Sequence, residues 1–411
     1  MGGGFPAVPQ SAGGQCSGLP ISSFDFGVCA LLLFFGVFFF ASCLKTSDFV
    51  NDSTYPDLAK FLVVNHSYQQ FSRPETLNPP GFPFVLAIVG MIAGFTPAVF
   101  LHLFAIFGTF ALLVSYWLLR QVECRGLAAI ACLLLASSRF MFTASTQLVF
   151  SHMPYFASSI MSLLLALKLG RNKPLRDSIL WMLLLGATLL FTIMVRTAGV
   201  AMLAGIVWWV PASFLSRRAV ARRRLTHFLH PLAMGASAIL VWTIWANHRE
   251  FSEWPLPGYP QSYVAQLTAK DGNHPELGYA QLSDLPARAK KNLLTWSTGL
   301  AVVLSHKEAN PSYWPSPAVI GVIGLGIIGL SSSLLNGGGQ LRDWYFLFYA
   351  AMYALWPWNF EWRFLLPIVP LGCMHLWRGA KVLTGFAKQQ PRLAGFCFLL
   401  AGPDVGAAFF A

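Results

Sequence analysis

The chain has 411 residues, of which 55% are hydrophobic and only 11% are charged, and its formal net charge is +12. Soluble domains carry about 25% charged residues, so this composition excludes an ordinary soluble globular protein. At about 20 residues for each transmembrane helix, the length allows about ten to twelve spans and one or two large loops. In such a protein the excess of Lys and Arg indicates cytoplasmic loops and contact with anionic lipid, and we expect no nucleic-acid partner.

Apolar runs divide the chain into a tail and one membrane module. Residues 1–27 are rich in Gly and Pro, contain no Lys or Arg, and are expected to form a flexible tail rather than a signal peptide. Residues 28–411 are expected to form an all-α polytopic module with about eleven transmembrane helices. The predicted spans are 28–44, 97–119, 126–143, 153–169, 178–195, 198–216, 229–247, 316–335, 343–357, 362–380 and 393–410.

Basic residues in the short connections predict how this module is oriented. The positive-inside rule places four such connections in the cytoplasm, namely 120–125, 171–176, 217–224 and 381–392. Counting spans back from the first of them puts the loop 46–96 on the outer side and the N-terminus in the cytoplasm. The apolar segment 82–95 is too short to cross comfortably and is expected to lie along the outer surface as a juxtamembrane helix. The same parity puts the long loop 248–314 outside.

The first outer loop contains a carboxylate suited to acid–base chemistry. Asp52 precedes a segment in which apolar residues recur at helical spacing from Tyr55 to Val63, so it lies at a predicted helix start. The helix dipole favours an ionised carboxylate there, and such a carboxylate can accept a proton from a hydroxyl group. The alternative interpretation is that Asp52 only caps the helix. Pro79-Pro80-Gly81 then fixes the backbone direction where the next helix begins.

Several basic side chains stand at the predicted outer ends of spans or in outer loops. Arg196 and Arg363 lie beside the outer membrane boundary, where a guanidinium either binds a phosphate or extends toward the lipid headgroups. Lys307, in the long outer loop, either contacts an anionic donor or belongs to a solvated charge cluster. His152 lies at a predicted outer turn and is interpreted either as a buried core histidine or as a contact of the acceptor.

Three motifs occur in a familiar order along the chain. Asp-Ser-x-Tyr begins at Asp52, Pro-Pro-Gly-Phe-Pro begins at Pro79, and Trp-Arg-Phe-Leu-Leu-Pro begins at Trp362. This order resembles the GT-C superfamily of membrane glycosyltransferases, in particular the glycosyltransferase 39 type. That branch includes protein mannosyltransferases and the aminoarabinose transferase of lipid A. The resemblance covers roughly residues 28–385.

The resemblance implies a sugar donor on a polyprenyl phosphate, used at the outer face by an inverting glycosyltransferase. It implies Asp52 as the catalytic base, with Asp48 as the nearby fallback. The other expected site residues are Arg363, Arg196 and Lys307 at the donor phosphate, and Tyr55 and His152 as loop and acceptor contacts. Some members of the superfamily use a divalent metal, and this sequence gives no clear ligand set, so no cofactor or metal ligand is assigned.

The expected acceptor is a hydroxyl group on a lipid, a glycan or a protein, and the expected location is a bacterial inner membrane with a non-cytoplasmic active site. An O-antigen ligase or polymerase shares the many spans and the large outer loop, but it lacks the early motif order. A secondary transporter would have broken helices in paired halves and charges near the membrane midplane. Most charges in this chain stand at span ends instead.

Overall fold

The computed structural model describes residues 20–43, 54–70, 73–147, 149–170, 175–216, 218–248, 267–272, 274–305, 317–335, 339–358 and 362–389. Its α-helices are α1 (Ser23–Cys43), α2 (Thr54–Val64), α3 (Gly81–Ala93), α4 (Pro97–Val122), α5 (Arg125–Ser137), α6 (Arg139–Thr146), α7 (His152–Leu169), α8 (Leu175–Val195), α9 (Val200–Ser216), α10 (Arg218–His248), α12 (Leu285–Ser305), α13 (Pro317–Leu335), α14 (Leu341–Ala354) and α15 (Val369–Gln389). Short 3₁₀ helices are η1 (Thr197–Gly199), η2 (Pro275–Leu277), η3 (Leu282–Asp284) and η4 (Trp362–Ile368). Two short antiparallel strands, β1 (Gln69–Gln70) and β2 (Arg73–Pro74), form a hairpin in the segment 46–96, the predicted first outer loop.

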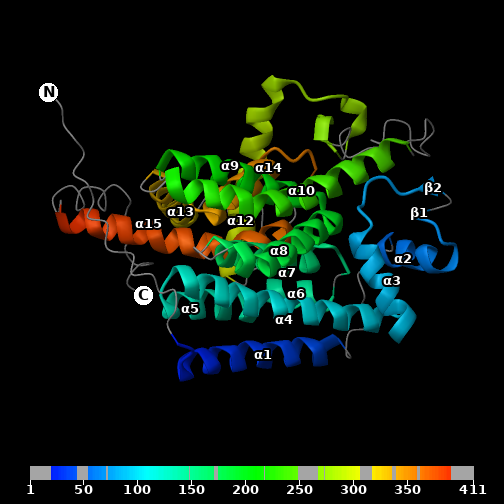
Figure 1. Cartoon of the computed structure of the whole chain (residues 1–411), viewed down its shortest axis with the longest axis horizontal. Coiled ribbons are helices and arrows are strands. Elements are labelled where there is room, and N and C mark those ends of the chain that lie inside the picture. Colours follow the sequence, from blue (N-terminus) through cyan, green and yellow to red (C-terminus); the bar gives the residue numbers. More distant parts are fainter. Residues whose placement is uncertain are drawn as a thin grey trace.

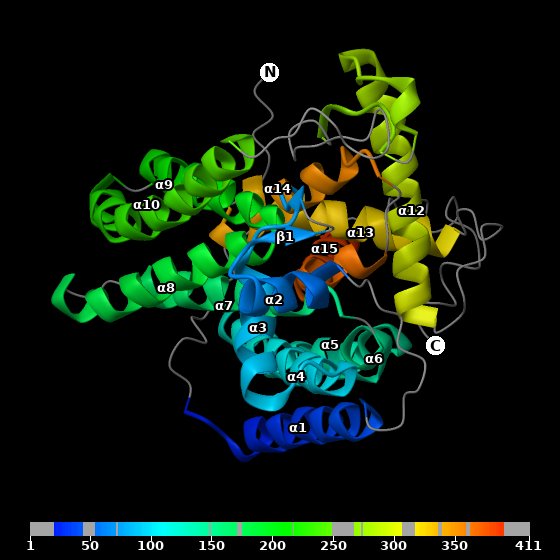
Figure 2. The ribbon, with the colours of Figure 1, turned by 90° about the vertical axis from the view of Figure 1, so that its right-hand side faces the viewer.

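Many of the long helices follow one axis, and α2, α3 and the hairpin gather at one end of that axis (Figure 1). The view along the axis shows α1 at the periphery and α2 and α3 in front of the middle of the bundle (Figure 2). Helix α7 forms much of the core, since most of its side chains are buried. Its buried serines Ser158, Ser159 and Ser162 donate to carbonyls of their own helix, which satisfies their hydroxyl groups inside an apolar core.

The prediction of an all-α polytopic membrane protein is confirmed. Within the described ranges, four stretches are long and apolar enough to cross a bilayer: α1, α4, Ser178–Val195 of α8 and Thr226–His248 of α10. The bent pair α5 and α6 would make a fifth. The count of eleven spans stays a prediction, and the last expected span, 393–410, lies outside the described residues.

The expected single span 126–143 is a pair of helices rather than one straight helix. Helices α5 and α6 meet at an angle of 60°. Ser138 stands between them with extended backbone angles, and its Oγ accepts a hydrogen bond from the Met141 amide at 3.1 Å. A serine at this position caps a new helix start, so the chain changes direction there.

Two segments expected to be loops are helical. The basic connection 217–224 is helical from Arg218 onward, because a run of Ala, Arg and Leu without Gly or Pro continues readily as a helix. The segment 248–314, which is expected to be a long outer loop, contains α12, which has 21 residues. The η3 turn before it is closed by a reciprocal cap between Gln281 and Asp284. In this cap the backbone N–H of Gln281 donates to Asp284 Oδ2 at 2.9 Å.

A buried ion pair attaches the peripheral helix α1 to α4. The Asp25 carboxylate is fully buried and accepts from Arg120 Nε at 2.7 Å and from the Tyr116 hydroxyl at 2.7 Å. Both Arg120 and Tyr116 lie near the C-terminal end of α4. A buried carboxylate needs such partners. These contacts therefore fix the rotation of α1 about its own axis and its position along the axis of α4.

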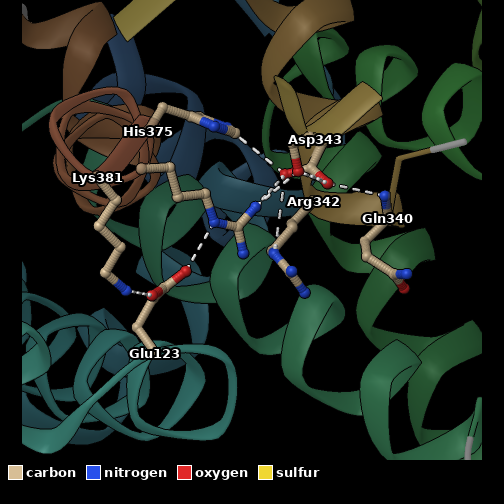
Figure 3. Close-up of polar contacts among 8 residues, drawn as sticks. Glu123, Gln340, Arg342, Asp343, His375 and Lys381 are labelled. Carbon is tan, nitrogen blue, oxygen red and sulfur yellow. Dashed lines mark hydrogen bonds and ion pairs between the residues drawn. The ribbon is translucent and has the colours of Figure 1, made fainter. Parts of the chain in front are cut away.

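A second charge cluster joins three elements at the end of the bundle opposite α2 and α3 (Figure 3). Arg378 of α15 contacts Glu123 at 2.7 Å and Asp343, at the start of α14, at 3.4 Å. His375 Nε2 lies 3.7 Å from the same Asp343, and Lys381 Nζ lies 3.4 Å from Glu123. Because Glu123 follows α4 directly, this cluster holds the α4–α5 connection, α14 and α15 together.

Candidate functional site

The predicted first outer loop, 46–96, is attached to the start of α7 through Tyr55. This residue lies in the first turn of α2, and its hydroxyl donates to Asn78 Oδ1 at 3.0 Å. The same hydroxyl lies 3.2 Å from Ser151 Oγ, just before α7 begins. The Tyr55 ring also packs edge-on against Phe82 of α3, with 4.9 Å between ring centroids. Helix α2, which the apolar spacing predicts, is therefore held against both α3 and α7.

Asn78 is the residue on which the contacts of this loop converge. The Glu75 carboxylate is buried, and its Oε1 accepts from the backbone amides of Leu77 and Asn78 at 2.8 and 2.9 Å. The Tyr68 hydroxyl donates to the Asn78 carbonyl at 2.6 Å. Burial and the neighbouring Glu75 charge raise the pKa of Tyr68 well above its ordinary value, so this hydroxyl keeps its proton at neutral pH. Glu75 thus shapes the loop that holds Tyr55.

The Pro-Pro-Gly corner lies directly against the turn that contains Arg196. A Cβ atom at Gly81 would lie 2.6 Å from the backbone carbonyl carbon of Met194 and 2.7 Å from its oxygen. Real side chains do not approach backbone so closely, so only glycine allows this contact. The corner that the sequence identifies is therefore also a packing contact between α3 and the end of α8.

Arg196 stands between α8 and η1, as the sequence predicts. Its carbonyl accepts from the Gly199 amide at 2.9 Å, and the Tyr155 hydroxyl donates to the Ala198 carbonyl at 3.1 Å. These two contacts fix the turn against the buried helix α7. The guanidinium carbon of Arg196 lies 4.4 Å from the centroid of the Phe364 ring, which is a cation–π contact.

Arg363 lies in η4, one residue before Phe364. Its guanidinium carbon is 3.7 Å from the centroid of the Phe150 ring and 5.6 Å from that of Phe364. The Tyr349 hydroxyl donates to the Phe364 carbonyl at 2.8 Å, and the Tyr353 ring stacks on Phe364 at 5.1 Å. Helix α14 thus holds the backbone of η4, and both arginines share the Phe364 ring.

His152 is buried beside these residues. Its ring lies 5.9 Å from the Phe150 ring and 6.4 Å from the Phe104 ring. The Ala144 carbonyl is close to the imidazole, yet neither ring nitrogen makes a hydrogen bond of ordinary geometry within the described part of the chain. His152 is therefore a buried histidine beside the candidate site, in keeping with the first of the two interpretations from the sequence, and its contact with an acceptor stays a prediction.

The structure brings four of the predicted site residues to one end of the molecule, linked through Ser151, Phe150 and Phe364: Tyr55, His152, Arg196 and Arg363. The other three, Asp48, Asp52 and Lys307, lie outside the described residues. Two guanidinium groups meet on one aromatic ring at this end. Such an arrangement suits a phosphate group, which arginine binds through charge-assisted hydrogen bonds.

The sequence interpretation did not identify the aromatic partners of the two arginines. Phe150 and Phe364 are ordinary members of a chain with 35 phenylalanines, so composition gives no signal for their contacts. The one local hint is that each stands near a residue already singled out, because Phe150 lies two residues before His152 and Phe364 directly follows Arg363. The hydrogen bonds between Glu75 and the backbone near Asn78 were missed for a similar reason. Contacts between loop residues two or three positions apart leave no periodic pattern in the sequence.

No group of three or more His, Cys, Asp or Glu side chains gathers within the ranges that the structure describes. Asp48 and Asp52 are outside those ranges, so the geometry assigns no metal ligands.

Comparison with solved structures shows the fold of this chain. The crystal structure of ArnT from Cupriavidus metallidurans bound to undecaprenyl phosphate is similar, with a TM-score of 0.59 and 14% identity. The similarity covers 92% of this chain and 65% of that one, so this chain spans a little less than two thirds of the ArnT length. A second solved structure is the archaeal oligosaccharyltransferase AglB from Archaeoglobus fulgidus in complex with an inhibitory peptide and a dolichol-phosphate. Its TM-score is 0.47 and its sequence identity to this chain is 15%. The similarity covers 91% of this chain and 52% of that chain. No protein-family model and no curated protein sequence matches the chain.

Proposed function

We propose, from the premise that this chain has the GT-C fold, that it is an inverting glycosyltransferase. In this proposal it moves a sugar from a polyprenyl phosphate to an acceptor hydroxyl on a lipid, a glycan or a protein, at the non-cytoplasmic membrane face. One observation supports the proposal above all. Arg196 and Arg363 meet on the Phe364 ring at the end of the molecule where Tyr55 lies, three residues after Asp52.

In the proposed reaction, Asp52 accepts the proton of the acceptor hydroxyl, with Asp48 as the alternative base. The hydroxyl oxygen then attacks the anomeric carbon, and the bond from that carbon to the phosphate oxygen breaks. The negative charge that develops stays on the polyprenyl phosphate. A base near the attacking oxygen contributes about 100-fold or more to such a step.

Arg363 and Arg196 would stabilise the leaving phosphate. An aromatic ring attracts a guanidinium without neutralising its charge, so the contacts with Phe150 and Phe364 hold both groups in place as cations. Cations aimed in advance at the position where charge develops lower the barrier, because they need no reorganisation during the reaction. His152, at the start of α7, and Tyr55, in the first turn of α2, would contact the acceptor or the sugar.

A transfer assay with radiolabelled undecaprenyl-phosphate-linked hexoses and pentoses tests this proposal. Asp52→Asn is expected to lower the rate of sugar transfer by about 100-fold or more at normal expression. Asp57→Asn is the matched control, because Asp57 is also an acid near the start of α2 and no role in the reaction is proposed for it. Wild-type activity in Asp52→Asn would remove Asp52 from the mechanism, and loss of activity in Asp48→Asn instead would make Asp48 the base.

The same assay separates the transferase from a secondary transporter. Proteoliposomes that accumulate a labelled sugar without forming a new glycosidic bond would contradict the proposed function. Release of undecaprenyl phosphate in step with a glycosylated product would support it.

A further inference from the structure

Helix α12 of the long outer loop has two polar side chains on its buried face. Arg288 is 9% exposed and Asn292 is 2% exposed. Residues four apart share one face of a helix, so both point to the same side. Lys290 and Lys291 lie between them and are exposed. Buried polar groups require hydrogen-bond partners, and the partners here come from a different part of the chain.

Asn292 binds the C-terminal end of α14. Its Nδ2 lies 3.3 Å from the Tyr353 carbonyl oxygen, 3.0 Å from that of Ala354 and 2.8 Å from that of Trp356. The last carbonyls of a helix have no partner within the helix. The amide of Asn292 therefore caps α14 from a neighbouring element.

Arg288 joins the same helix end to a second segment of the outer loop. Its Nη1 donates to the Leu355 carbonyl at 3.2 Å, and its Nη2 donates to the carbonyls of Ala269 and Lys270 at 2.6 and 2.9 Å. Ala269 pairs with Tyr279 in an isolated antiparallel bridge. One guanidinium thus links α12, the 269–279 turn and the end of α14.

The 269–279 turn also packs on the residues that follow α14. The Gly272 amide donates to the Pro357 carbonyl at 2.8 Å. A Cβ atom at Gly272 would collide with the Trp358 ring, so the absence of a side chain permits this contact. The chain between α14 and η4 is therefore held by the outer loop at several backbone positions.

These contacts hold α14, the helix that supports the proposed donor site. Helix α14 supports η4 through Tyr349 and Tyr353, which contact Phe364, and its end leads within a few residues to Arg363. A shift of the α14 end would move both the support of Phe364 and the chain that enters η4. Arg363 would then lose its position relative to Arg196.

We propose that Arg288 and Asn292 are positioning residues for the donor-phosphate site, which act by fixing the C-terminal end of α14. This inference rests on the proposed function, since it assumes that Arg363 binds a polyprenyl phosphate. Both side chains bind the C-terminal end of α14, so their effect on Arg363 passes through the backbone of α14 and η4. Loss of either should weaken binding of the lipid phosphate while the protein remains folded.

The test uses the full-length protein in detergent and undecaprenyl phosphate as the probe. Asn292→Asp keeps the size of the side chain but replaces the amide donor with a carboxylate oxygen that faces three carbonyl oxygens. We expect the Kd for undecaprenyl phosphate to rise about tenfold. We also expect faster hydrogen exchange at residues 353–356 and 362–368. Lys290→Ala, on the exposed face of α12, is the matched control and should change neither quantity.

Arg288 supplies a second, milder variant. Arg288→Lys retains a cation that can donate to carbonyls, so it should restore most of the affinity that Arg288→Ala loses. In transfer assays the substitutions should raise KM for the donor more than they lower kcat. A role limited to stability would instead lower the melting temperature and leave the Kd of the folded protein unchanged.

The outcomes separate this inference from the proposed function. If the wild-type protein does not bind undecaprenyl phosphate, the proposed donor is wrong and the positioning role falls with it. If the wild type binds the lipid and folded Asn292→Asp binds it equally well, the proposed function stands and the positioning role is overturned.

Discussion

At the scale of single residues, close backbone contact decides how the first outer loop meets the Arg196 turn. Gly81 lies against Met194 at distances that leave no room for a Cβ atom. The atoms in its way belong to backbone, so they cannot rotate aside as the tip of a flexible side chain would. Because Gly81 has no side chain beyond a hydrogen atom, the Pro-Pro-Gly corner can lie this close to the candidate site.

Gly81→Ala should destabilise the protein and separate the corner from the turn. Overpacking of this kind costs about 1–3 kcal/mol, and a lower melting temperature in detergent is the measurement. Gly385→Ala provides the control, because that glycine is exposed in α15 and a Cβ atom there would meet nothing within 4 Å. Alanine favours a helix over glycine, so the control should be neutral or slightly stabilising. Equal melting temperatures for the two variants would show that the Gly81 contact is not tight.

At the scale of elements, the charge cluster at the far end of the bundle determines how α14 and α15 meet the α4–α5 connection. Arg378 is the shared cation, since it contacts Glu123, Asp343 and the Ser333 hydroxyl. The Asp343 carboxylate is fully buried and the Glu123 side chain is 7% exposed. Carboxylates at such depth need cationic and hydrogen-bonding partners, and Arg378 is a cation that contacts both of them.

Arg378→Ala should therefore cost about 3 kcal/mol of stability, because it leaves both buried carboxylates short of a partner. Lys381→Ala is a matched control that removes a cation from the same Glu123. The Lys381 side chain is 54% exposed, and exposed ion pairs contribute only about 0–1 kcal/mol. Thermal unfolding of both variants measures the difference. Similar losses for the two would mean that burial does not govern this cluster.

At the scale of the whole molecule, the two ends of the bundle carry different groups of polar residues. One end has α2, α3 and the β1–β2 hairpin (Figure 1), with the paired arginines and His152 close to them. The ion-pair clusters around Asp25 and Asp343 involve the C-terminal end of α4 and the residue that follows it. The positive-inside rule predicts that the first of these ends faces away from the cytoplasm. The proposed use of a lipid-linked donor at the outer face depends on that orientation.

Cysteine labelling of intact cells tests this orientation. Cys124 is exposed in the basic α4–α5 connection, so a variant that retains only this cysteine should react with a membrane-impermeant maleimide after permeabilisation but not before. Ser283→Cys, in a background from which all seven native cysteines are removed, lies in the exposed η3 turn and should react in intact cells. Reaction of both positions from the same side would contradict the predicted topology.

The sequence by itself determined the membrane class, the positions of most helices and the resemblance to GT-C enzymes. Apolar runs long enough to span a bilayer and a motif order from Asp52 to Pro367 are properties of the chain alone. The helical spacing from Tyr55 to Val63 likewise predicted α2, since the spacing of apolar residues along the chain identifies the helix face that must be buried.

Only the tertiary structure decided the bend at Ser138, the presence of α12 in the outer loop and the contacts of the candidate site. A capping hydroxyl, the Phe150 and Phe364 rings beside two arginines, and the Asn292 amide on the end of α14 all depend on residues that are distant in the chain or lack any periodic pattern. Patterns along a chain report which face of an element is buried, because burial repeats with the helical turn. They do not report which other element covers that face, because that choice depends on how all the helices pack at once.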